Sequence, residues 1–348
     1  MSASANHDYA LVIGIDHYPH LKELEGPVKD AKRVADWLEL HGGLPRENVK
    51  RIESSRAHQG QPVLAEVDVA LEEILTRAEA PASAGRRLYI YFAGHGMSQE
   101  LEHVALFMAD AAEGRYNRAA ANAVEYRKAL ARRVFREQIY LFDCCRRYDA
   151  VTWGTKPNWD THPKEKNLTG LVQVVMFAAG FQEAAWERRM HYDERHGLFT
   201  EALMEGLDGA AASQNRIVTS DRLASYVQRR VEDLARRWKV EEDQNCECVV
   251  YGRQRPLILA TDVDQRVQSV TVTFPKGTKH LIVTDEGGET LTAIPVRPHD
   301  TDAVLDLPLA WLKITAESTA STRASKVIDL MPDEGNTTYL VDLGGSAP

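Results

Sequence analysis

The chain has 348 residues, a formal net charge of −9 and 44% hydrophobic residues, so it can bury an α/β core and supply a second small domain. This composition excludes an intrinsically disordered protein, and the mild acidity argues against nucleic acid as the main partner. No apolar run approaches about 18 residues and no signal peptide opens the chain, so we expect neither a membrane span nor export. Four cysteines, two of them adjacent, make a poor disulfide framework and favour a reducing cytoplasm.

Strands and helices alternate through the first half of the chain, as the spacing of its apolar residues indicates. Buried strands are expected at Tyr9–Ile15, Val49–Ile52, Leu88–Phe92, Val104–Met108, Ile139–Phe142 and Val172–Phe177. Helices are expected at Val28–Leu40, Val63–Ala78 and Ala119–Phe135. Strands separated by helices predict an α/β fold with a mainly parallel sheet and helices on both faces.

Two of these strands end in residues that carry chemistry. Leu88–Phe92 runs into a glycine-flanked His95, and Ile139–Phe142 runs into an acid followed by Cys144 and Cys145. Because the carboxyl ends of neighbouring parallel strands meet at one edge of a sheet, we expect His95 and Cys145 to lie close together. A cysteine attacks as the thiolate, and a nearby histidine can take its proton and later give it to a leaving amine. Either residue alone is usually a loop histidine or an inert buried thiol, but the pair favours catalysis.

Less regular sequence follows the second of these strands. Residues 146–169 are polar, show no clean period and are expected to form a linker loop, which at this length is either functional or disordered. Helices are then expected at His196–Leu207, with a tight entry at Gly197, and from Ser220 to about Trp238, with a final strand near Leu257–Leu259. Cys246 and Cys248 supply at most two metal ligands, and no second pair stands at zinc spacing, so we interpret them as structural.

The pattern changes beyond about Asp262. Short β-rich runs punctuated by Gly and Pro predict a small sandwich or barrel, with strands at Val267–Phe274, His280–Thr284, Thr290–Val296, Ala303–Leu307, Leu309–Thr315, Ser325–Leu330 and Thr337–Leu343. We therefore expect two domains, residues 1–262 and residues 263–348. No catalytic cluster lies in the second domain, and the sequence leaves open whether it recognises a partner, restrains the first domain or stabilises it.

Five motifs along the chain resemble those of caspase-like cysteine peptidases, the clan that includes caspases and metacaspases. They stand in the family's order and are closest to bacterial metacaspase-like members: ALVIGID at residues 10–16, LEGPVKD at 24–30, YFAGHG at 91–96, FDCC at 142–145 and GLFTEAL at 197–203. The resemblance covers about residues 8–260 and implies a caspase-like fold and a cysteine endopeptidase. Fifty positions separate His95 from Cys145, about the separation that caspases show between their His and Cys.

By this resemblance Cys145, two places after the acid, is the nucleophile, and His95 is the general base. Cys144 remains the alternative if this register is wrong by one residue. The backbone N–H groups of Gly96 and Cys145 are the natural oxyanion hole, since a glycine lets the main chain approach the substrate. No third side chain stands out to orient His95.

Specificity is expected to depend on two acids. Asp143 stands where metacaspase-like relatives, which accept arginine or lysine, carry an acid, and Asp30 matches their second pocket acid. A carboxylate at the floor of a pocket can hold a guanidinium through two charge-assisted hydrogen bonds. We therefore predict cleavage after Arg, and less readily after Lys. The alternative for Asp30 is an ordinary acid at a helix N-terminus.

The chain departs from the metacaspase pattern at four positions, which leave the catalytic pair intact. They are Pro27, Ala93 in place of a serine, and Arg146 and Arg147 in place of the His-Ser that follows the nucleophile.

Regulation is also implied by the resemblance. Protein substrates and an upstream activating protease or regulator are expected, with activation by cleavage in the 146–169 loop at one of the basic residues Arg146, Arg147, Lys156, Lys164 or Lys166; a plain surface loop is the alternative. Bacterial relatives act in stress, cell death or defence against phage. Some relatives depend on calcium, for which acids such as Asp149 and Asp160 are a weak signal, and no other cofactor is expected.

Two other functions stay open. The chain could be a catalytically inactive interaction scaffold, although the presence of both His95 and Cys145 speaks against this. It could instead be a flavodoxin-like binder of a nucleotide or signalling ligand, although Gly14 is followed by no further glycines at dinucleotide spacing.

Overall fold

The computed structural model describes residues 5–80, 84–159, 170–189, 194–252, 255–285, 287–318, 323–332 and 339–344. The chain divides into two compact units. The first unit comprises residues 1–204 and 219–260, and the second comprises residues 205–218 and 261–348. Within the described ranges, no helix combines the length and the apolar character that crossing a membrane requires.

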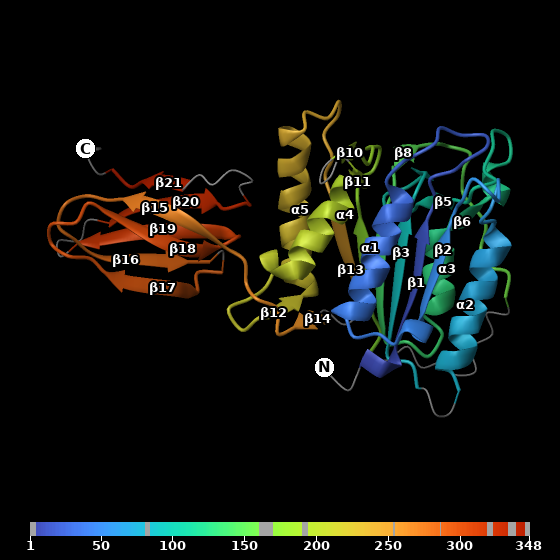
Figure 1. Ribbon diagram of the computed structural model, residues 1–348, viewed down its shortest axis with the longest axis horizontal. Helices are drawn as coiled ribbons and strands as arrows, with labels where there is room; N and C mark the ends of the chain where they lie inside the picture. Colours follow the sequence, from blue (N-terminus) through green and yellow to red (C-terminus); the bar gives the residue numbers. More distant parts are fainter. Residues whose placement is uncertain are drawn as a thin grey trace. The chain divides into compact units, whose positions relative to one another are not determined.

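The first unit is built on a six-stranded sheet with the order β13-β9-β7-β3-β1-β2 (Figure 1). Its strands are β1 (Asp8–Gly14), β2 (Val49–Glu53), β3 (Arg87–Ala93), β7 (Glu137–Asp143), β9 (Val172–Phe177) and β13 (Glu247–Gly252). All neighbours pair in parallel except β13, which runs antiparallel to β9. The predicted mainly parallel sheet is confirmed. The strand predicted near Leu257–Leu259 is β14 (Ile258–Thr261), which lies outside this sheet, whereas no strand is predicted from the sequence at β13.

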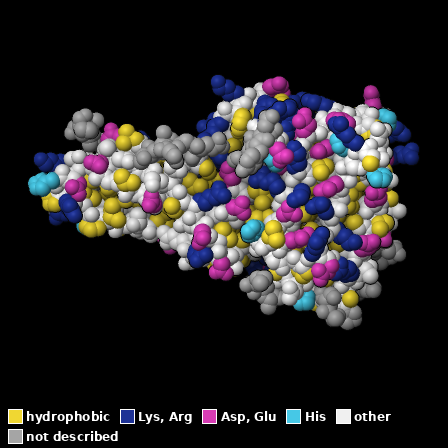
Figure 2. All heavy atoms as spheres, in the orientation of Figure 1, with side chains coloured by type: hydrophobic (Ala, Val, Ile, Leu, Met, Phe, Trp, Pro, Cys, Tyr) yellow, Lys and Arg dark blue, Asp and Glu magenta, His cyan; other side chains and the backbone are white. Residues whose placement is uncertain are grey.

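Helices cover both faces of this sheet, as predicted. They are α1 (Pro27–Leu40), α2 (Leu64–Ala78), α3 (Ala123–Leu130), α4 (Leu198–Glu205) and α5 (Ser220–Arg237). In Figure 1, α2 and α3 lie on one side of the sheet and α1, α4 and α5 on the other. Every residue of β1 and β3 is buried, as expected of strands that are covered twice. Figure 2 shows acidic and basic side chains interspersed over the visible face of the first unit.

The predicted helix at Ala119–Phe135 is shorter than expected. Its first residues form β6 (Ala120–Asn122), and the Asn122 side chain then accepts a hydrogen bond of 3.1 Å from the Glu125 N–H and so caps α3. The predicted helix at His196 likewise begins later. His196 and Gly197 belong to β11 (Arg195–Gly197), which pairs with β10 (Glu187–Arg189). Within the described ranges, 3₁₀ turns lie at Ala5–His7, Arg46–Asn48 and Tyr116–Arg118.

A smaller sheet holds the loops that follow β3 and β7. It has the order β6-β5-β4-β8, with β4 at Gly96–Ser98, β5 at Ala105–Phe107 and β8 at Arg147–Tyr148. β4 begins directly after His95, and β8 begins two residues after Cys145. Because β4 and β8 pair in parallel, the two loops are fixed on both sides, by the large sheet before them and by the small sheet after them.

The second unit contains two antiparallel-rich sheets, with the orders β18-β15-β21 and β17-β16-β19-β20. Its strands are β15 (Val267–Thr273), β16 (Thr278–Thr284), β17 (Thr290–Pro295), β18 (Asp302–Pro308), β19 (Trp311–Ser318), β20 (Arg323–Asp329) and β21 (Tyr339–Asp342). Alternate residues such as Val270 and Val272, or Leu281 and Val283, are fully buried. The predicted β-rich C-terminal region is confirmed. Residues 205–218, with a π-helical turn at Gly206–Ala210 and most of β12 (Ile217–Thr219), also belong to this unit.

Candidate active site

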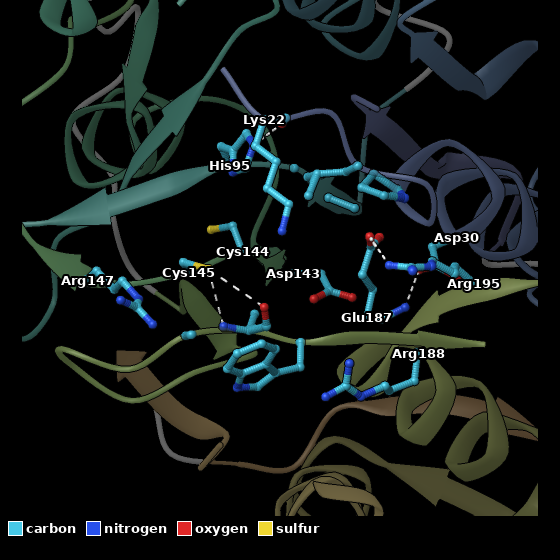
Figure 3. A pocket seen from close by; sticks show the side chains of 18 residues that line it. Lys22, Asp30, His95, Asp143, Cys144, Cys145, Arg147, Glu187, Arg188 and Arg195 are labelled. Carbon is cyan, nitrogen blue, oxygen red and sulfur yellow. Dashed lines mark hydrogen bonds and ion pairs between the residues drawn. The ribbon is translucent and has the colours of Figure 1, made fainter. Parts of the chain in front are cut away.

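A cavity of about 380 Å³ lies at the carboxyl ends of β3 and β7. It is lined by the loop after β1, the first turn of α1, the ends of both strands and the segment from Ala184 to Arg188. Figure 3 shows His95, Cys144 and Cys145 on one side of this cavity and Asp30, Glu187 and Arg195 on the other, with Asp143 between them. The cavity therefore joins a side with a thiol and an imidazole to a side rich in carboxylates.

The structure brings His95 and Cys145 to the same cavity, as the sequence predicted. β3 pairs with β7 so that Ala93 lies opposite Asp143, and each of the two residues stands two places beyond that pair. Gly94, between strand and histidine, has φ 157°, and a Cβ there would lie 2.5 Å from the Tyr18 hydroxyl. Only a glycine can make this turn against the tyrosine.

His95 is oriented by two contacts that the sequence did not reveal. Its Nε2 lies 2.7 Å from the carbonyl oxygen of Lys22, and its backbone N–H donates to the Tyr18 hydroxyl at 3.0 Å. Because a carbonyl oxygen only accepts, Nε2 carries the proton and Nδ1 is left as the base. Burial lowers the pKa of His95, which favours the neutral imidazole that a base must be. A backbone carbonyl can come from any residue type, so Lys22 left no signal in the sequence.

Cys145 is held by Ala185 in this structure. The Ala185 N–H donates to the sulfur at 3.4 Å, and the thiol faces the Ala185 carbonyl oxygen at 3.7 Å (Figure 3). Burial raises the pKa of the Cys145 thiol. Between the described side chains of Cys145 and His95 there is no hydrogen bond, so proton transfer needs the thiol to leave Ala185.

Cys144 is buried and makes the poorer nucleophile, because its pKa is raised well above the ordinary value by burial. Gly96 packs directly against it, and a Cβ at Gly96 would lie 2.7 Å from the Cys144 sulfur and 2.9 Å from the Cys145 carbonyl oxygen. Gly96 itself is buried beside the cavity, whereas Cys145 lines it. The role of both backbone N–H groups as an oxyanion hole stays a prediction.

Asp143 and Asp30 lie together at the carboxylate-rich side. The Thr200 hydroxyl donates to Asp143 at 2.6 Å and lies 2.6 Å from the Tyr91 hydroxyl. Burial, followed by the charge of Asp30, raises the pKa of Asp143 to about 7. Gly197 of β11 packs against Asp143 because it has no side chain: a Cβ there would lie 2.4 Å from the Asp143 Oδ2.

Asp30 is more than an ordinary acid at a helix N-terminus. It stands in the first turn of α1, but its carboxylate reaches β11, where one oxygen lies 2.7 Å from the His196 Nδ1 and the other accepts from the Gly197 N–H at 2.7 Å. The Val28 N–H at the start of α1 is bound instead by Asp16. Asp30 therefore ties α1 to β11 beneath the cavity.

Glu187 is a third carboxylate in the cavity, and the sequence did not single it out. It accepts from the N–H groups of Glu25 and Gly26, at 3.2 and 2.9 Å, and lies 3.5 Å from the Arg195 guanidinium. It belongs to the segment from Ala184 to Arg188, every residue of which lines the cavity. Which side chains of this segment face the cavity depends on the pairing of β10 with β11. Strands this short leave too little sequence pattern to predict their pairing.

Arg146 is not available as a cleavage site in this state, contrary to its inclusion among the predicted sites. It is fully buried, lies over the Phe177 ring at 4.2 Å, and donates to Glu247 and to the carbonyl oxygens of Ala179 and Leu101. The sequence could not show which of two adjacent arginines is buried. Arg147 and Lys156 are exposed, whereas Lys164 and Lys166 lie outside the described residues.

Metal ligands do not gather in the described part of the chain, where no group of three or more His, Cys, Asp or Glu side chains is placed to hold an ion. Asp149 accepts from Val151 and Thr152 within its own turn, and Asp160 lies outside the described residues. Calcium dependence stays an untested prediction.

Comparison with known proteins identifies the family. A family model described as the caspase domain, Peptidase_C14, matches residues 7–268. A solved structure described as "structure of pro-sf-caspase-1" is 15% identical, with a TM-score of 0.41, and the match covers 73% of this chain and 94% of that chain. The search of curated proteins gave no match. On the strength of the family model, which spans the sheet, the helices and the cavity described above, the chain belongs to the caspase domain family of cysteine peptidases.

Proposed function

We propose that this protein is a cysteine endopeptidase that cleaves proteins after Arg, and less readily after Lys, with Cys145 as nucleophile and His95 as general base. The observation that carries the proposal is the placement of Asp143. It is 8% exposed, lines the same cavity as Cys145 and His95, and forms no ion pair among the described residues. A buried carboxylate without a cation is costly, so it favours a substrate that brings one.

The proposed chemistry follows from the contacts of the catalytic pair. His95 Nδ1 takes the proton of Cys145, and the thiolate attacks the carbonyl carbon of the scissile peptide to form a tetrahedral oxyanion. The oxyanion collapses, the C–N bond breaks, and the imidazolium gives its proton to the leaving amine. Water, deprotonated by His95, then hydrolyses the thioester and restores the thiol. The hydrogen bond from Nε2 to Lys22 keeps the imidazole in one tautomer throughout.

Arg is favoured over Lys by the number of acceptors. Asp143 and Asp30 together offer several free lone pairs, and the planar guanidinium can engage two carboxylate oxygens at once, whereas an ammonium acts as a point charge. Arg195 does not satisfy this need, because it is paired with Glu187 and Glu25.

A panel of fluorogenic peptides with Arg, Lys or Asp at the P1 position tests this proposal. Wild type should turn over Arg fastest, then Lys, and the Cys145→Ala variant should turn over none. Cys144→Ala, which changes the neighbouring thiol, should keep the order of preference. Faster turnover of Asp, or full activity in Cys145→Ala, would overturn the proposed specificity or the proposed nucleophile.

The resting contacts of Cys145 support regulation. The thiol is bound to Ala185 and not to His95, so the described state is not poised for attack. We propose that a cut in the 146–169 loop activates the protein. Among the described residues of that loop, Arg147 and Lys156 are the exposed candidate sites. The chain itself or an upstream protease would make the cut. A role in bacterial stress, cell death or antiphage defence rests on analogy with relatives. Mass spectrometry of wild type and Cys145→Ala after incubation would locate any cut that the chain makes in itself.

A further inference from the structure

His196 is a buried histidine that the proposed reaction does not yet use. Its side chain is 7% exposed, and its Nδ1 lies 2.7 Å from Asp30 Oδ1, while the next residue, Gly197, donates its N–H to Asp30 Oδ2 at 2.7 Å. Two consecutive residues of β11 thus hold both oxygens of the carboxylate. Figure 3 shows Asp30 at the carboxylate-rich side of the cavity, the side on which the proposed function places a basic P1 side chain.

We propose that His196 is a positioning residue of the P1 pocket, which orients the Asp30 carboxylate and whose protonation competes with a basic substrate side chain for that carboxylate. This inference rests on the proposed function and deepens it. When the imidazole is neutral, Nδ1–H donates to Asp30, and the full charge of the acid is left for the substrate. When the imidazole is protonated, it neutralises Asp30 itself, and the substrate cation loses one of its two partners.

Among the described basic side chains, His196 is the one within hydrogen-bond distance of Asp30. From α1, Arg33 is also close, but it pairs with Glu201 of α4 at 2.7 Å. From the approach to β11, Glu194 lies 3.9 Å from the His196 Nε2. The other charged groups that line the pocket are the carboxylates Asp143 from β7 and Glu187 from β10 and four basic residues, Lys22, Arg147, Arg188 and Arg195. Of these, Arg188 stands opposite His196 in the β10–β11 pair, and Arg195 is paired with Glu25 and Glu187. A guanidinium bound to Asp30 would stand beside the imidazole, so the two positive charges would repel each other across one carboxylate.

Binding and protonation are therefore reciprocal. A proton on His196 weakens binding of a P1 cation. By linkage, a bound P1 cation must weaken the binding of that proton to His196 by the same factor. A histidine that only tied α1 to β11 would hold Asp30 in place but would show no exchange between proton and ligand. This difference separates a positioning role in the pocket from a purely structural one.

Kinetics with two variants and a control test the proposal. His196→Asn keeps an N–H donor for Asp30 but cannot be protonated, and His196→Ala removes the donor. His103→Asn changes another buried histidine, which bonds to the Trp153 carbonyl oxygen away from the pocket. Each protein is assayed between pH 5.5 and 8 with matched peptides carrying Arg or uncharged citrulline at P1.

At pH 8 we expect His196→Ala to raise the KM for the Arg peptide by about tenfold, with a much smaller change in kcat, and His196→Asn to restore most of the loss. As the pH falls, the Arg KM of wild type and His103→Asn should rise more steeply than that of His196→Asn, which retains only the contributions of the two acids, Asp143 and Asp30, whose pKa values burial raises. The citrulline KM should stay flat. Equal pH dependence in wild type and His196→Asn, or a wild-type Arg KM in His196→Ala, would overturn the proposal.

A binding measurement keeps the two proposals apart. In Cys145→Ala protein with isotope-labelled histidine, N-acetyl-arginine amide added at pH 6 should move the His196 ring signals toward their positions at alkaline pH, and N-acetyl-citrulline amide should not. If wild type cleaves no basic peptide, the proposed function fails, and this titration still decides the inference. Arginine amide that binds without moving these signals, or that does not bind, would overturn it.

Discussion

Asp143 combines the two properties on which the proposed specificity depends, burial and a lack of a cationic partner within the described residues. With a pKa of about 7, it loses its charge as the pH falls through neutrality, and a guanidinium then loses its partner. The Thr200 hydroxyl opposes this loss, because it donates to the charged form at 2.6 Å.

Thr200→Val removes this donor and should raise the pKa of Asp143 further. We therefore expect the acid limb of kcat/KM for an Arg peptide to move to higher pH, while Thr200→Ser, which keeps a hydroxyl, leaves it in place. Profiles from pH 5 to 9 measure the shift. An acid limb that is the same in all three proteins would show that Asp143 does not control binding.

Asp143→Asn should abolish cleavage after Arg but stabilise the folded state. The unfolded chain ionises this acid near its ordinary pKa of 3.8 and the folded chain near 7, so the folded state binds more protons in between, and stability falls as the pH rises through that window. Asparagine does not titrate, so the variant does not lose stability in this way as the pH rises. We expect the difference in Tm, variant minus wild type, to be larger at pH 8 than at pH 4, together with loss of Arg cleavage. A Tm difference that does not change with pH would contradict the assignment.

At the scale of elements, the approach of β11 to β7 depends on one glycine. Gly197→Ala would place a Cβ 2.4 Å from the Asp143 carboxylate, so we expect a loss of about 1–3 kcal/mol in the free energy of unfolding and impaired Arg cleavage. Gly287→Ala serves as a control, since its nearest neighbour is 3.4 Å away. Denaturant unfolding measures both, and an unchanged Gly197→Ala protein would contradict this packing.

Arg146 and Arg147, which follow the proposed nucleophile, make a matched pair of variants for testing the loop after β7. Arg146→Met would leave two backbone carbonyls and Glu247 without their buried donor, at a cost of about 2–3 kcal/mol in unfolding free energy, reduced because Glu247 is partly exposed. Arg147→Met removes only an exposed ion pair with Glu242 and should cost about 0.5 kcal/mol or less. Equal losses in the two variants, measured by denaturant unfolding, would be inconsistent with these contacts.

Local pattern explains which parts of the site could be predicted. Leu88–Phe92 and Ile139–Phe142 are apolar runs that predict buried strands. The positions of His95 and Cys145 just after these runs therefore predicted that the two residues lie at the same sheet edge. Glu187 lines the cavity, and His196 and Thr200 contact its carboxylates, only through the pairing of β10 with β11 and the packing of α4 on the sheet. Lys22 acts through its backbone. Contacts of these kinds form between distant segments, and no local spacing encodes them.

For the whole molecule, the division into units does not fall at one point of the chain. Residues 205–218 belong with the C-terminal unit, where the Arg266 N–H donates to the Gly209 carbonyl at 3.1 Å and the Gln265 side chain to that of Ala212 at 2.9 Å. A boundary after residue 262, as the change in sequence pattern indicated, separates these partners.

A chain that ends after residue 262 should therefore be less stable than one that ends after residue 268. We expect a difference in Tm of about 5 °C, because the shorter chain leaves the 205–218 segment without these hydrogen bonds. Thermal unfolding followed by circular dichroism compares the two with the full chain. A shorter chain that is equally stable would show that residues 263–268 do not hold this segment.

The central claim is that a buried carboxylate selects a positive charge at P1 while Cys145 and His95 break the bond. The most direct measurement is the ratio of kcat/KM for two peptides that differ only in Arg or citrulline at P1, which have nearly the same shape but differ in charge. We expect wild type to favour Arg by about 100-fold or more, as for the loss of one partner of a buried charge pair, and Cys145→Ala to cleave neither. Equal rates for the two peptides would contradict the claim.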